Sequence, residues 1–414
     1  MTASTTRRSL PADGVTWDVL ETEMRARRLD DIRGHWTKAF RAPRDVQEVG
    51  LKAYTMFLSD NGFVSLYHPY IGDIEQETLE MCVSLFHPLA DSCGNTTSGG
   101  SESIFCALHA AREWAREHRP VKGVPEIVLP YSAHPAFSKA CHYLGMKIVR
   151  TALAADYRGD VQAMADAVGP NTIALVGSAP CWPYGLYDRL EDISALAVQH
   201  GLWMHVDACV GGYLAPFVER LGHALPAWDF RLPGVQSISA DLHKLGYCPK
   251  PMSTVLWRSA GLQKFHYVSP VDWPAGEYKM MGLVGSRSGG PVFAAWCTLK
   301  YLGDSGYLRL AGQVLDAKRR LVDGIRAIEG LDAWDTDLLP VAFGSKGDDL
   351  EAIVGGMTAL GWVLLGNYEP PLVNLPVDAA TDDAVIDTFL DELADVTGKV
   401  HRGEIDAKGE LRYG

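Results

Sequence analysis

The strongest constraint on the fold is a regular alternation of short apolar runs and amphipathic stretches between about residues 95 and 257. The apolar runs have the length of strands and cover Glu126–Leu129, Met146–Val149, Thr172–Val176, Leu202–Val206, Ser237–Ser239 and Thr254–Trp257. The stretches with helical spacing between them are Glu102–Glu117, His134–Leu144, Val161–Ala167 and Leu190–His200. Strands that alternate with helices predict an α/β fold whose mostly parallel sheet is covered by helices on both faces.

The pattern changes after Gly290, and this change divides the chain. Two long helical stretches, two short strand-like runs and a closing helix are expected at Pro291–Leu302, Tyr307–Glu329, Pro340–Phe343, Trp362–Leu365 and Asp382–Val396. At the other end, Val15–Met56 has a mostly helical composition. We therefore expect an N-terminal helical segment (1–58), a large α/β domain (59–303) and a smaller C-terminal α/β domain (304–414).

Composition and charge argue against several classes of protein. A formal net charge of −13 over 414 residues argues against partners such as nucleic acid and anionic membrane surfaces. No apolar run approaches the ~20 residues of a membrane span, and the polar start of the chain lacks the apolar core of a secretory signal. The eight cysteines form no CxxC pair and show no spacing suited to zinc. We therefore expect a cytoplasmic protein with reduced thiols and no metal.

A His-Lys pair follows one of the apolar runs, in the sequence Ser239-Ala-Asp-Leu-His243-Lys244. Enzymes that use pyridoxal 5'-phosphate (PLP) need one such lysine, because its amine condenses with the aldehyde of the cofactor. His243 is placed to pack on the cofactor or to move a proton. A lysine in a surface loop is the simpler interpretation of the dipeptide alone, so the prediction depends on what accompanies it.

The second part of the pattern is a carboxylate at the end of a strand. Asp207 directly follows the buried run Leu202–Val206, and a buried carboxylate is costly unless it is paired. In a PLP site its partner is the ring nitrogen, whose protonation makes the ring an electron sink. A helix cap is the alternative, and a metal at His205-x-Asp207 would lack a third ligand. The spacing to Lys244 places both groups at the same edge of the sheet.

Small residues ahead of a helical stretch form the third part, Thr96-Thr-Ser98-Gly99-Gly100-Ser101-Glu-Ser103. Such residues let the backbone approach an anion closely, and a helix N-terminus supplies free N–H groups. No lysine follows, so this is not a P-loop, and a flexible turn with a serine cap is the alternative. His134 is placed either to stack on the cofactor ring or to cap a helix. Gly285-Ser286-Arg287 is a second loop suited to an anion.

In the order small-residue cup, His134, Asp207 and Lys244, these parts resemble the group II decarboxylase superfamily of fold-type I PLP enzymes. Within that superfamily, the amino-acid sequences of these motifs are most similar to those of the sphingosine-1-phosphate lyase family. The resemblance runs from about residue 52 to residue 307, and its most specific stretches are Asp91–Ser103, His205–Gly212, Ser237–Lys250 and Gly285–Gly289. It implies a seven-stranded sheet in the large domain and a homodimer whose subunits share the active site.

The resemblance also implies a role for each motif residue. Lys244 holds PLP as a Schiff base, Asp207 pairs with the ring nitrogen, and His134 stacks on the ring. The phosphate is held by Ser98, Gly99, Gly100 and Ser101, together with Ser286 from the partner subunit. The substrate contacts correspond to His68 and Lys250, and Tyr278 is a further candidate. In two departures, Phe40 stands near a tyrosine of the bacterial lyases, and the membrane-spanning lead of the eukaryotic ones has no counterpart.

These roles predict a carbon–carbon lyase that cleaves a 2-amino-3-hydroxy compound, phosphorylated or otherwise anionic, into an aldehyde and an amine. The same residues would serve an amino-acid decarboxylase, because the bond that breaks is the one held perpendicular to the ring. A catalytically inactive binding protein is the third hypothesis, and the presence of both Lys244 and Asp207 argues against it. The general base stays open among Tyr184, His205, His243 and Tyr278.

Overall fold

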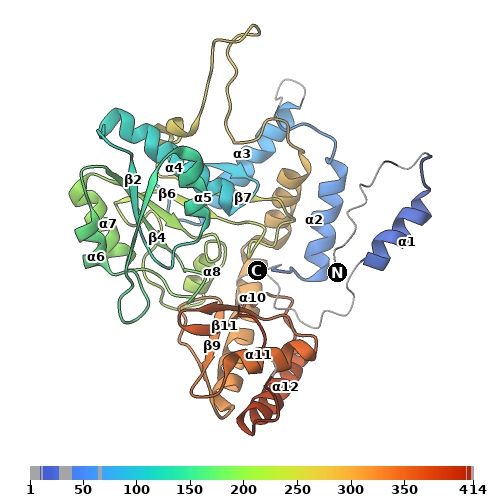
Figure 1. Ribbon diagram of the computed structural model, residues 1–414. Helices are drawn as coiled ribbons and strands as arrows, with labels where there is room; N and C mark the ends of the chain where they lie inside the picture. Colours follow the sequence, from blue (N-terminus) through green and yellow to red (C-terminus); the bar gives the residue numbers. More distant parts are fainter. Residues whose placement is uncertain (1–9, 11–12, 28–39, 64–67, 407, 412–414) are drawn as a thin grey trace.

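The centre of the protein is a seven-stranded sheet with strand order β1-β7-β6-β5-β4-β2-β3, seen in a computed structural model (Figure 1). The structure describes residues 10, 13–27, 40–63, 68–406 and 408–411. The strands are β1 (Cys93–Thr97), β2 (Glu126–Pro130), β3 (Lys147–Thr151), β4 (Thr172–Ser178), β5 (Trp203–Asp207), β6 (Val235–Ala240) and β7 (Ser253–Trp257). Only β7 runs antiparallel to its neighbours, β1 and β6. This confirms the predicted α/β fold with a mostly parallel seven-stranded sheet.

Helices cover both faces of this sheet, because its strands are apolar on both sides. In β4, for example, Leu175 packs in one hydrophobic cluster, whereas its neighbours Ala174 and Val176 pack in another on the opposite face. The helices are α4 (Gly100–His118), α5 (Ala136–Leu144), α6 (Val161–Ala167), α7 (Leu190–His200), α8 (Ala215–Arg220) and α9 (Ala260–Gln263). The bounds of α6 and α7 are those expected from the sequence. The Asp160 side chain caps α6, and Gly201, with a left-handed φ of 59°, ends α7.

The parallel strands bring several loops to one edge of the sheet. Strands β5 and β6 pair in parallel with Asp207 opposite Ser239, so the residues that follow both strands leave at the same edge. The loop after β4 leaves there too, since Ser178 pairs with Asp207. Ligands of open α/β sheets bind at this carboxyl edge.

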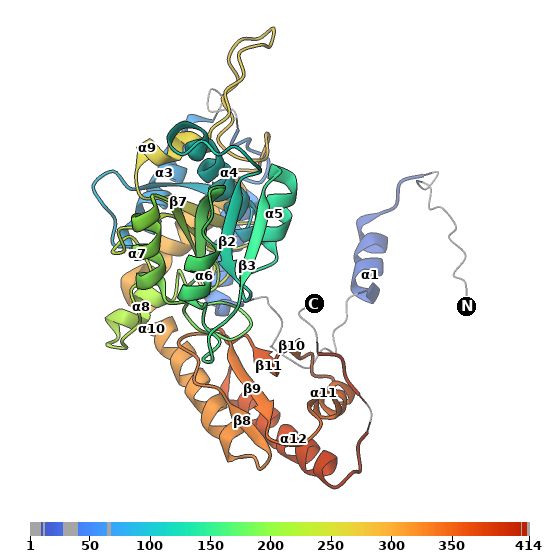
Figure 2. The ribbon, with the colours of Figure 1, turned by 60° about the vertical axis from the view of Figure 1, so that its left-hand side comes forward.

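A second sheet, antiparallel and four-stranded, lies in the C-terminal part with strand order β10-β11-β9-β8 (Figure 2). Its strands are β8 (Leu331–Ala333), β9 (Val341–Ser345), β10 (Leu365–Tyr368) and β11 (Pro371–Leu375), and α11 (Leu350–Ala359) and α12 (Asp383–His401) accompany them. The expected strand Trp362–Leu365 is wrong in position: Trp362 is buried against Phe389 in an isolated bridge, and the strand begins only at Leu365.

One long helix, α10 (Gly290–Ala327), joins the two sheet regions. The two helices expected there are a single element broken at Gly303, whose φ of 53° and ψ of −173° are not helical. The kink lies at the expected boundary between large and small domains; the division into 1–58, 59–303 and 304–414 itself stays a prediction.

The N-terminal stretch expected to be helical contains α1 (Trp17–Arg27) and α2 (Arg44–Met56), while residues 28–39 between them lie outside the described part of the chain. Helix α1 has no buried residue and stands away from the body of the protein in both views (Figures 1 and 2). Helix α2 packs along α10, and α3 (Pro69–Ser84) follows it. None of the helices described here is long and apolar enough to cross a membrane.

A loop between Val268 and Met280 projects from the large-sheet region (ochre, top of Figure 1). Two backbone hydrogen bonds between these residues close its base, with N···O distances of 3.2 and 2.8 Å. Val271 and Trp273 near its tip are 74% and 55% exposed. We call residues 268–280 the projecting loop.

Candidate active site

A cavity of about 400 Å³ opens at the carboxyl edge of the large sheet. It is lined by Ser98, Gly99, Gly100, Ser101, Glu102, Ile104, His134, Ser178, Pro180, Cys181, Trp182, Asp207, Cys209, Val210, Asp241, His243 and Lys244. The cup, the expected stacking histidine, the strand-end carboxylate and the His-Lys pair therefore meet in one place. They come from the ends of four different strands, which explains why they are far apart in the sequence.

Lys244 enters the cavity from the turn after β6 and is paired with a carboxylate that the sequence analysis did not single out. Its Nζ lies 2.9 Å from Oδ2 of Asp241, whose side chain is only 3% exposed. Burial alone would lower the pKa of Lys244, but the charge of Asp241 outweighs it and raises that pKa above its ordinary value. Burial likewise opposes ionisation of Asp241, yet Lys244 and His243 hold its pKa below the usual range. The two charges therefore stabilise one another.

Asp207 ends β5 and is held in a fixed orientation. Its Oδ1 accepts hydrogen bonds from the backbone N–H of Cys209 at 3.1 Å and from the hydroxyl of Ser239 at 3.3 Å. Among the described residues no hydrogen bond reaches Oδ2, and the carboxylate lines the cavity. A buried carboxylate with one oxygen fixed and the other unused suits a protonated ring nitrogen.

The cup is formed by the end of β1 and the first turn of α4. Glu102 accepts hydrogen bonds from the backbone N–H and the hydroxyl of Ser98, at 2.7 and 2.6 Å, which fixes the turn. A Cβ on Gly100 would lie 2.6 Å from the sulfur of Cys209 and 3.1 Å from the carboxylate of Asp241. A Cβ on Gly99 would meet only His243, at 3.5 Å. The bare backbone at Gly100 and the free N–H groups of α4 suit a phosphate.

Two histidines complete the lining, and each has one ring nitrogen fixed by the backbone. His134, two residues ahead of α5, accepts the N–H of Ala136 on Nδ1 at 3.1 Å. His243 accepts the N–H of Met252 on Nδ1 at 3.2 Å, and its Nε2 lies 3.8 Å from Asp241. Burial lowers the pKa of His243, so the ring is neutral near pH 7 and carries its proton on Nε2.

The expected substrate residues and Ser286 do not line this cavity. His68 and Ser286 line a second cavity of about 630 Å³, which adjoins the first because both include Ser98 and Glu102. Ser286 there accepts a hydrogen bond from the side chain of Asn61 at 3.3 Å. Lys250 is exposed, and Tyr278 lies in the projecting loop with its ring 5.2 Å from that of Phe63. Residues 64–67, just before His68, lie outside the described chain.

The remaining candidates for the general base lie outside the cavity lining. His205 is fully buried within the sheet, with its ring nitrogens 2.9 and 3.2 Å from the hydroxyls of Ser237 and Ser239. Burial lowers the pKa of His205 to about 4. Tyr184 donates its hydroxyl to the backbone oxygen of Glu369 at 2.6 Å, and burial raises its pKa to about 12. Of the four candidates, only His243 lines the cavity.

Asp241 and Trp182 are among the lining residues to which sequence reasoning gave no role. The signal for Asp241 was present, because it precedes Lys244 by three positions in a tight turn, and such spacing brings side chains together. Trp182 carried no signal, since its place depends on how the loop after β4 folds. Within the described residues no group of three or more His, Cys, Asp and Glu side chains is arranged to hold a metal ion.

The sheet, the cavity at its carboxyl edge and the arrangement of Lys244, Asp207 and the cup define the class of a fold-type I PLP enzyme. The family model for the pyridoxal-dependent decarboxylase conserved domain matches residues 37–331. The chain belongs to this family, and its cofactor is PLP.

Several individual proteins are similar to this chain over most of its length. Sphingosine-1-phosphate lyase 1 of Mus musculus is 38% identical over 366 residues, covering 86% of this chain and 63% of the mouse protein. The chain therefore spans about 63% of the length of that relative. A probable L-tyrosine/L-aspartate decarboxylase of Methanothermobacter thermautotrophicus is 33% identical over 286 residues, 69% of this chain and 77% of that protein. The solved sphingosine-1-phosphate lyase of Burkholderia pseudomallei matches with a TM-score of 0.90 and 34% identity, covering 96% of this chain and 94% of the other. These findings confirm the predicted resemblance to the sphingosine-1-phosphate lyases.

Proposed function

We propose that the protein is a PLP-dependent carbon–carbon lyase that cleaves a 2-amino-3-hydroxy compound into an aldehyde and an amine. The observation that carries the proposal is the meeting of Lys244, Asp207, His134 and the cup in one cavity. The likeness to proteins named sphingosine-1-phosphate lyase supports cleavage of a carbon–carbon bond. When bound, PLP supplies the electron sink for the carbanion that cleavage leaves behind.

Each lining group has a separate task in this proposal. The cup, Ser98 to Ser101, would hold the cofactor phosphate, and Asp207 would pair with the ring nitrogen. His134 would lie against the ring, and Lys244 would carry the cofactor. Asp241 lies 2.9 Å from the Lys244 nitrogen and forms an ion pair with its ammonium group. In this proposal it positions the lysine while the cofactor is being bound.

His243 has the geometry of a hydrogen-bond donor. Its Nδ1 is occupied by the N–H of Met252, so only Nε2 is free to contact a ligand in the cavity. A neutral ring with its proton on Nε2 would donate a hydrogen bond to that ligand and orient it. We expect His243→Phe, which keeps a flat ring but has no donor, to lower kcat by about tenfold while KM changes little, because a hydrogen bond contributes about 1 kcal/mol. A variant with full kcat would show that this hydrogen bond does not assist the reaction.

We also propose a homodimer in which each active site takes groups from both subunits. Ser286, His68 and Tyr278 lie outside the lining of the chain's own cavity, and the projecting loop exposes apolar side chains. Mixing refolded Lys244→Met with Tyr278→Ala tests this, because a mixed dimer contains one intact site. Activity that appears only in the mixture supports sharing, whereas a monomer on sizing columns that binds PLP tightly contradicts it.

We further propose that His68 and Lys250 bind an anionic group of the substrate. We expect Lys250→Ala to raise KM for a phosphorylated substrate at least tenfold and to leave KM for its dephosphorylated analogue unchanged. Lys264→Ala is the matched control: both lysines are exposed, but the charge of Lys250 reaches His243 in the cavity and helps to lower its pKa, whereas Lys264 pairs with Glu117. Equal effects on both substrates would refute a phosphate contact at Lys250.

The second candidate function is decarboxylation of an amino acid by the same site. The family name and the likeness to a probable decarboxylase of M. thermautotrophicus favour it. The products separate the two functions: the lyase releases an aldehyde and no CO2, whereas the decarboxylase releases CO2. Borohydride reduction followed by peptide mapping tests what both share, a pyridoxyl group on Lys244. Absence of that adduct after addition of PLP would overturn both candidates.

We further place the protein in the cytoplasm, in line with its eight free cysteines. Cell fractionation tests this proposal, and recovery of the protein with membranes would contradict it.

A further inference from the structure

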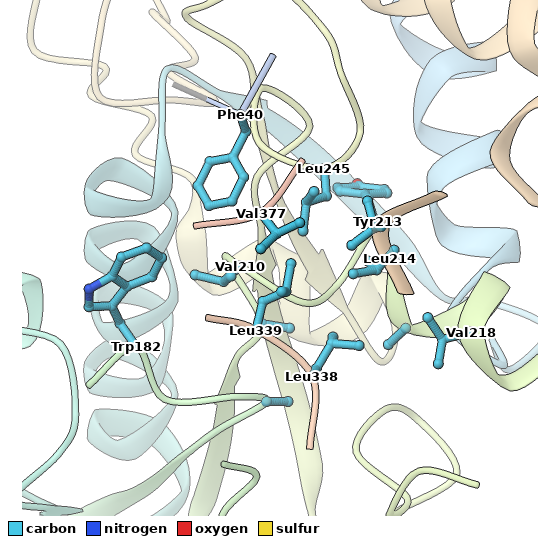
Figure 3. Close-up of a cluster of buried hydrophobic side chains, with 14 of the residues drawn as sticks. Phe40, Trp182, Val210, Tyr213, Leu214, Val218, Leu245, Leu338, Leu339 and Val377 are labelled. Carbon is cyan, nitrogen blue, oxygen red and sulfur yellow. The ribbon is translucent and has the colours of Figure 1, made fainter. Parts of the chain in front are cut away.

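One wall of the cofactor cavity is formed by an indole side chain that none of the assigned roles uses. Trp182 lines the cavity and is only 7% exposed. Its ring packs edge-on against Phe40, with centroids 6.3 Å apart and an interplanar angle of 84°. Phe40 is itself 4% exposed, and Val210, which also lines the cavity, lies beside the pair (Figure 3). The wall is therefore backed by packed side chains.

The backbone that carries Trp182 is held by the C-terminal part of the chain. The loop closes on itself through a hydrogen bond from the N–H of Cys181 to the oxygen of Leu186, at 2.9 Å. Asn367 donates its side-chain amide to the oxygen of Pro183 at 3.1 Å, and Tyr184 donates to the oxygen of Glu369 at 2.6 Å. Strand β10 and the turn after it therefore hold the middle of the loop through two hydrogen bonds, at Pro183 and Tyr184.

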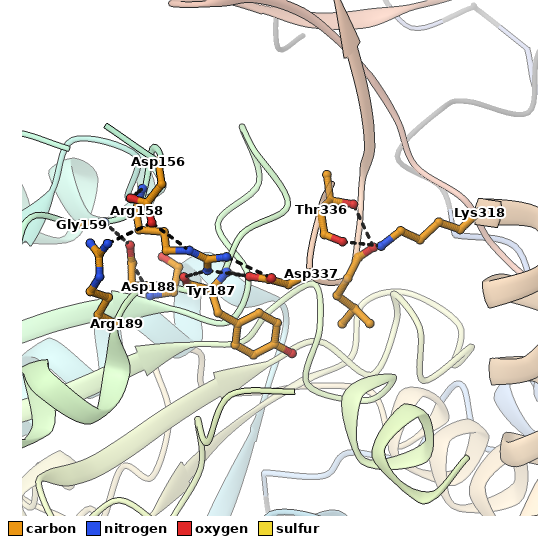
Figure 4. A network of polar contacts seen from close by, with 11 residues as sticks. Asp156, Arg158, Gly159, Tyr187, Asp188, Arg189, Lys318, Thr336 and Asp337 are labelled. Atoms are coloured by element: carbon orange, nitrogen blue, oxygen red, sulfur yellow. Dashed lines mark hydrogen bonds and ion pairs between the residues drawn. The ribbon is translucent and has the colours of Figure 1, made fainter. Parts of the chain in front are cut away.

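A third grip comes from Asp337 (Figure 4). Its backbone N–H donates to the oxygen of Gly185 at 2.9 Å, and its carboxylate accepts the N–H of Tyr187 at 2.7 Å. Arg158 holds the same carboxylate with two parallel hydrogen bonds of 2.6 and 3.0 Å. We call these contacts of Asp337, Asn367 and Glu369 the interdomain clamp. These contacts hold the backbone that follows Trp182, and so help to fix the position of the wall.

The size of the cavity gives this rigid wall its significance. Ligand pockets ordinarily measure roughly 300 to 1,000 Å³. This one of about 400 Å³ must hold PLP and whatever part of the substrate lies against Trp182, because the adjoining cavity of about 630 Å³ does not include Trp182. We infer that Trp182 is the specificity-determining residue that limits substrate size, and that the substrate presents a group of a few carbons, not a long hydrocarbon chain, to this wall. The inference rests on the proposed function for its substrate class.

Binding of amines that cannot be cleaved tests the wall without requiring turnover. Straight-chain 2-amino-1-alkanols of 3 to 18 carbons lack the 3-hydroxyl, and calorimetric titration of the PLP-loaded protein measures their Kd. We expect the wild type to lose affinity by roughly tenfold or more beyond a short chain length, because one methylene at a filled wall is worth about 10-fold or more. Trp182→Ala should move this limit to longer chains and strengthen binding of those chains at least tenfold.

Two further variants distinguish an effect of Trp182 on substrate size from a general effect on the stability of the fold. Trp182→Phe keeps a ring against Phe40 and should move the limit by less than the alanine variant. Trp228→Phe is the matched control: Trp228 is fully buried, packs edge-on against Phe86 at 5.2 Å and does not line the cavity. Its Nε1 has no hydrogen-bond partner among the described residues, so phenylalanine removes no hydrogen bond. We expect Trp228→Phe to leave the chain-length limit unchanged.

Turnover of a second series links the wall to the reaction. Phosphorylated 2-amino-1,3-diols of the same chain lengths should show a kcat/KM that falls with length in the wild type and recovers in Trp182→Ala. If the wild type binds 18-carbon amines as tightly as short ones, or if the substitution weakens all lengths alike, the inference is wrong. If the binding limit moves as expected but no diol is cleaved, the wall stands and the lyase proposal fails.

Discussion

Replacing Asp241 by asparagine tests whether the cofactor lysine depends on this buried carboxylate. The two side chains are nearly equal in size, and the amide oxygen of the asparagine would still accept the hydrogen bond that Ser253 donates at 2.5 Å. What disappears is the negative charge 2.9 Å from the ammonium group of Lys244. The variant therefore isolates one electrostatic interaction at the centre of the site.

The expected cost follows from burial. Removing one partner of a buried ion pair costs about 3–5 kcal/mol, because the other charge stays desolvated. Asp241 is 3% exposed and Lys244 24% exposed, so water still reaches the ammonium group, and we expect the lower part of the range. For the protein stripped of PLP we therefore expect Asp241→Asn to lower the free energy of unfolding by about 3 kcal/mol at pH 7.

Urea unfolding of the wild type, Asp241→Asn, Lys244→Met and the double variant completes the measurement. Each single substitution leaves one buried charge unpaired, whereas the double variant leaves none, so its stability should lie near that of the wild type. We expect a coupling energy of about 3 kcal/mol or more, because the double variant should regain at least what Asp241→Asn alone loses. Additive effects of the two substitutions would refute the view that Asp241 and Lys244 stabilise one another.

Three further predictions concern the cup, a buried histidine and the interdomain clamp. We expect Gly100→Ala to weaken PLP binding at least tenfold, with a smaller effect for Gly99→Ala, because only the first places a Cβ closer than 3.0 Å to a neighbour; equal Kd values would contradict this. The pKa of His205 falls from about 6.5 in the unfolded chain to about 4 when folded, so the unfolded chain takes up the proton first. About 3 kcal/mol of stability present above pH 6.5 should then be lost as the pH falls to 4, and urea titrations of His205→Gln should lack this loss; a pH dependence identical to the wild type would disprove the assignment. Arg158→Lys cannot form the paired hydrogen bonds to Asp337, and it should lower the unfolding free energy by about 1–2 kcal/mol; no change would show that the contact does not stabilise the fold.

The large sheet was predictable because its signal is local and repeated. Strand β4 is a run of apolar residues, and the helices α6 and α7 carry their own start and stop signals in Asp160 and Gly201. Strand β1 was not predicted as a strand, because its residues Cys93–Thr97 are small and polar. It is a strand because β7 pairs with it across the whole length.

The site was predictable in its chemistry but not in its enclosure. Lys244, Asp207 and the cup each follow a recognisable strand, and the carboxyl edge of the sheet brings such residues together. The Trp182 wall depends on a loop that is held by residues 150 to 185 positions later in the chain. Contacts of that range leave no periodic pattern in a single sequence. The break in α10 was expected between Leu302 and Tyr307, but its continuity across Gly303 was not, since a glycine alone does not say whether a helix ends or bends there.

The clamp also orders the events by which the active site is made. The loop that carries Tyr184 leaves the ribosome 185 residues before Glu369, to which it will be fastened. At roughly 5–20 residues per second, synthesis of that interval takes about 10 to 40 s. The cup, Asp207 and Lys244 are all translated well before this interval ends, but the hydrogen bonds from Asn367 and Glu369 to the loop of the Trp182 wall cannot yet form. The complete wall of the cofactor cavity therefore forms only after nearly the whole chain has been made.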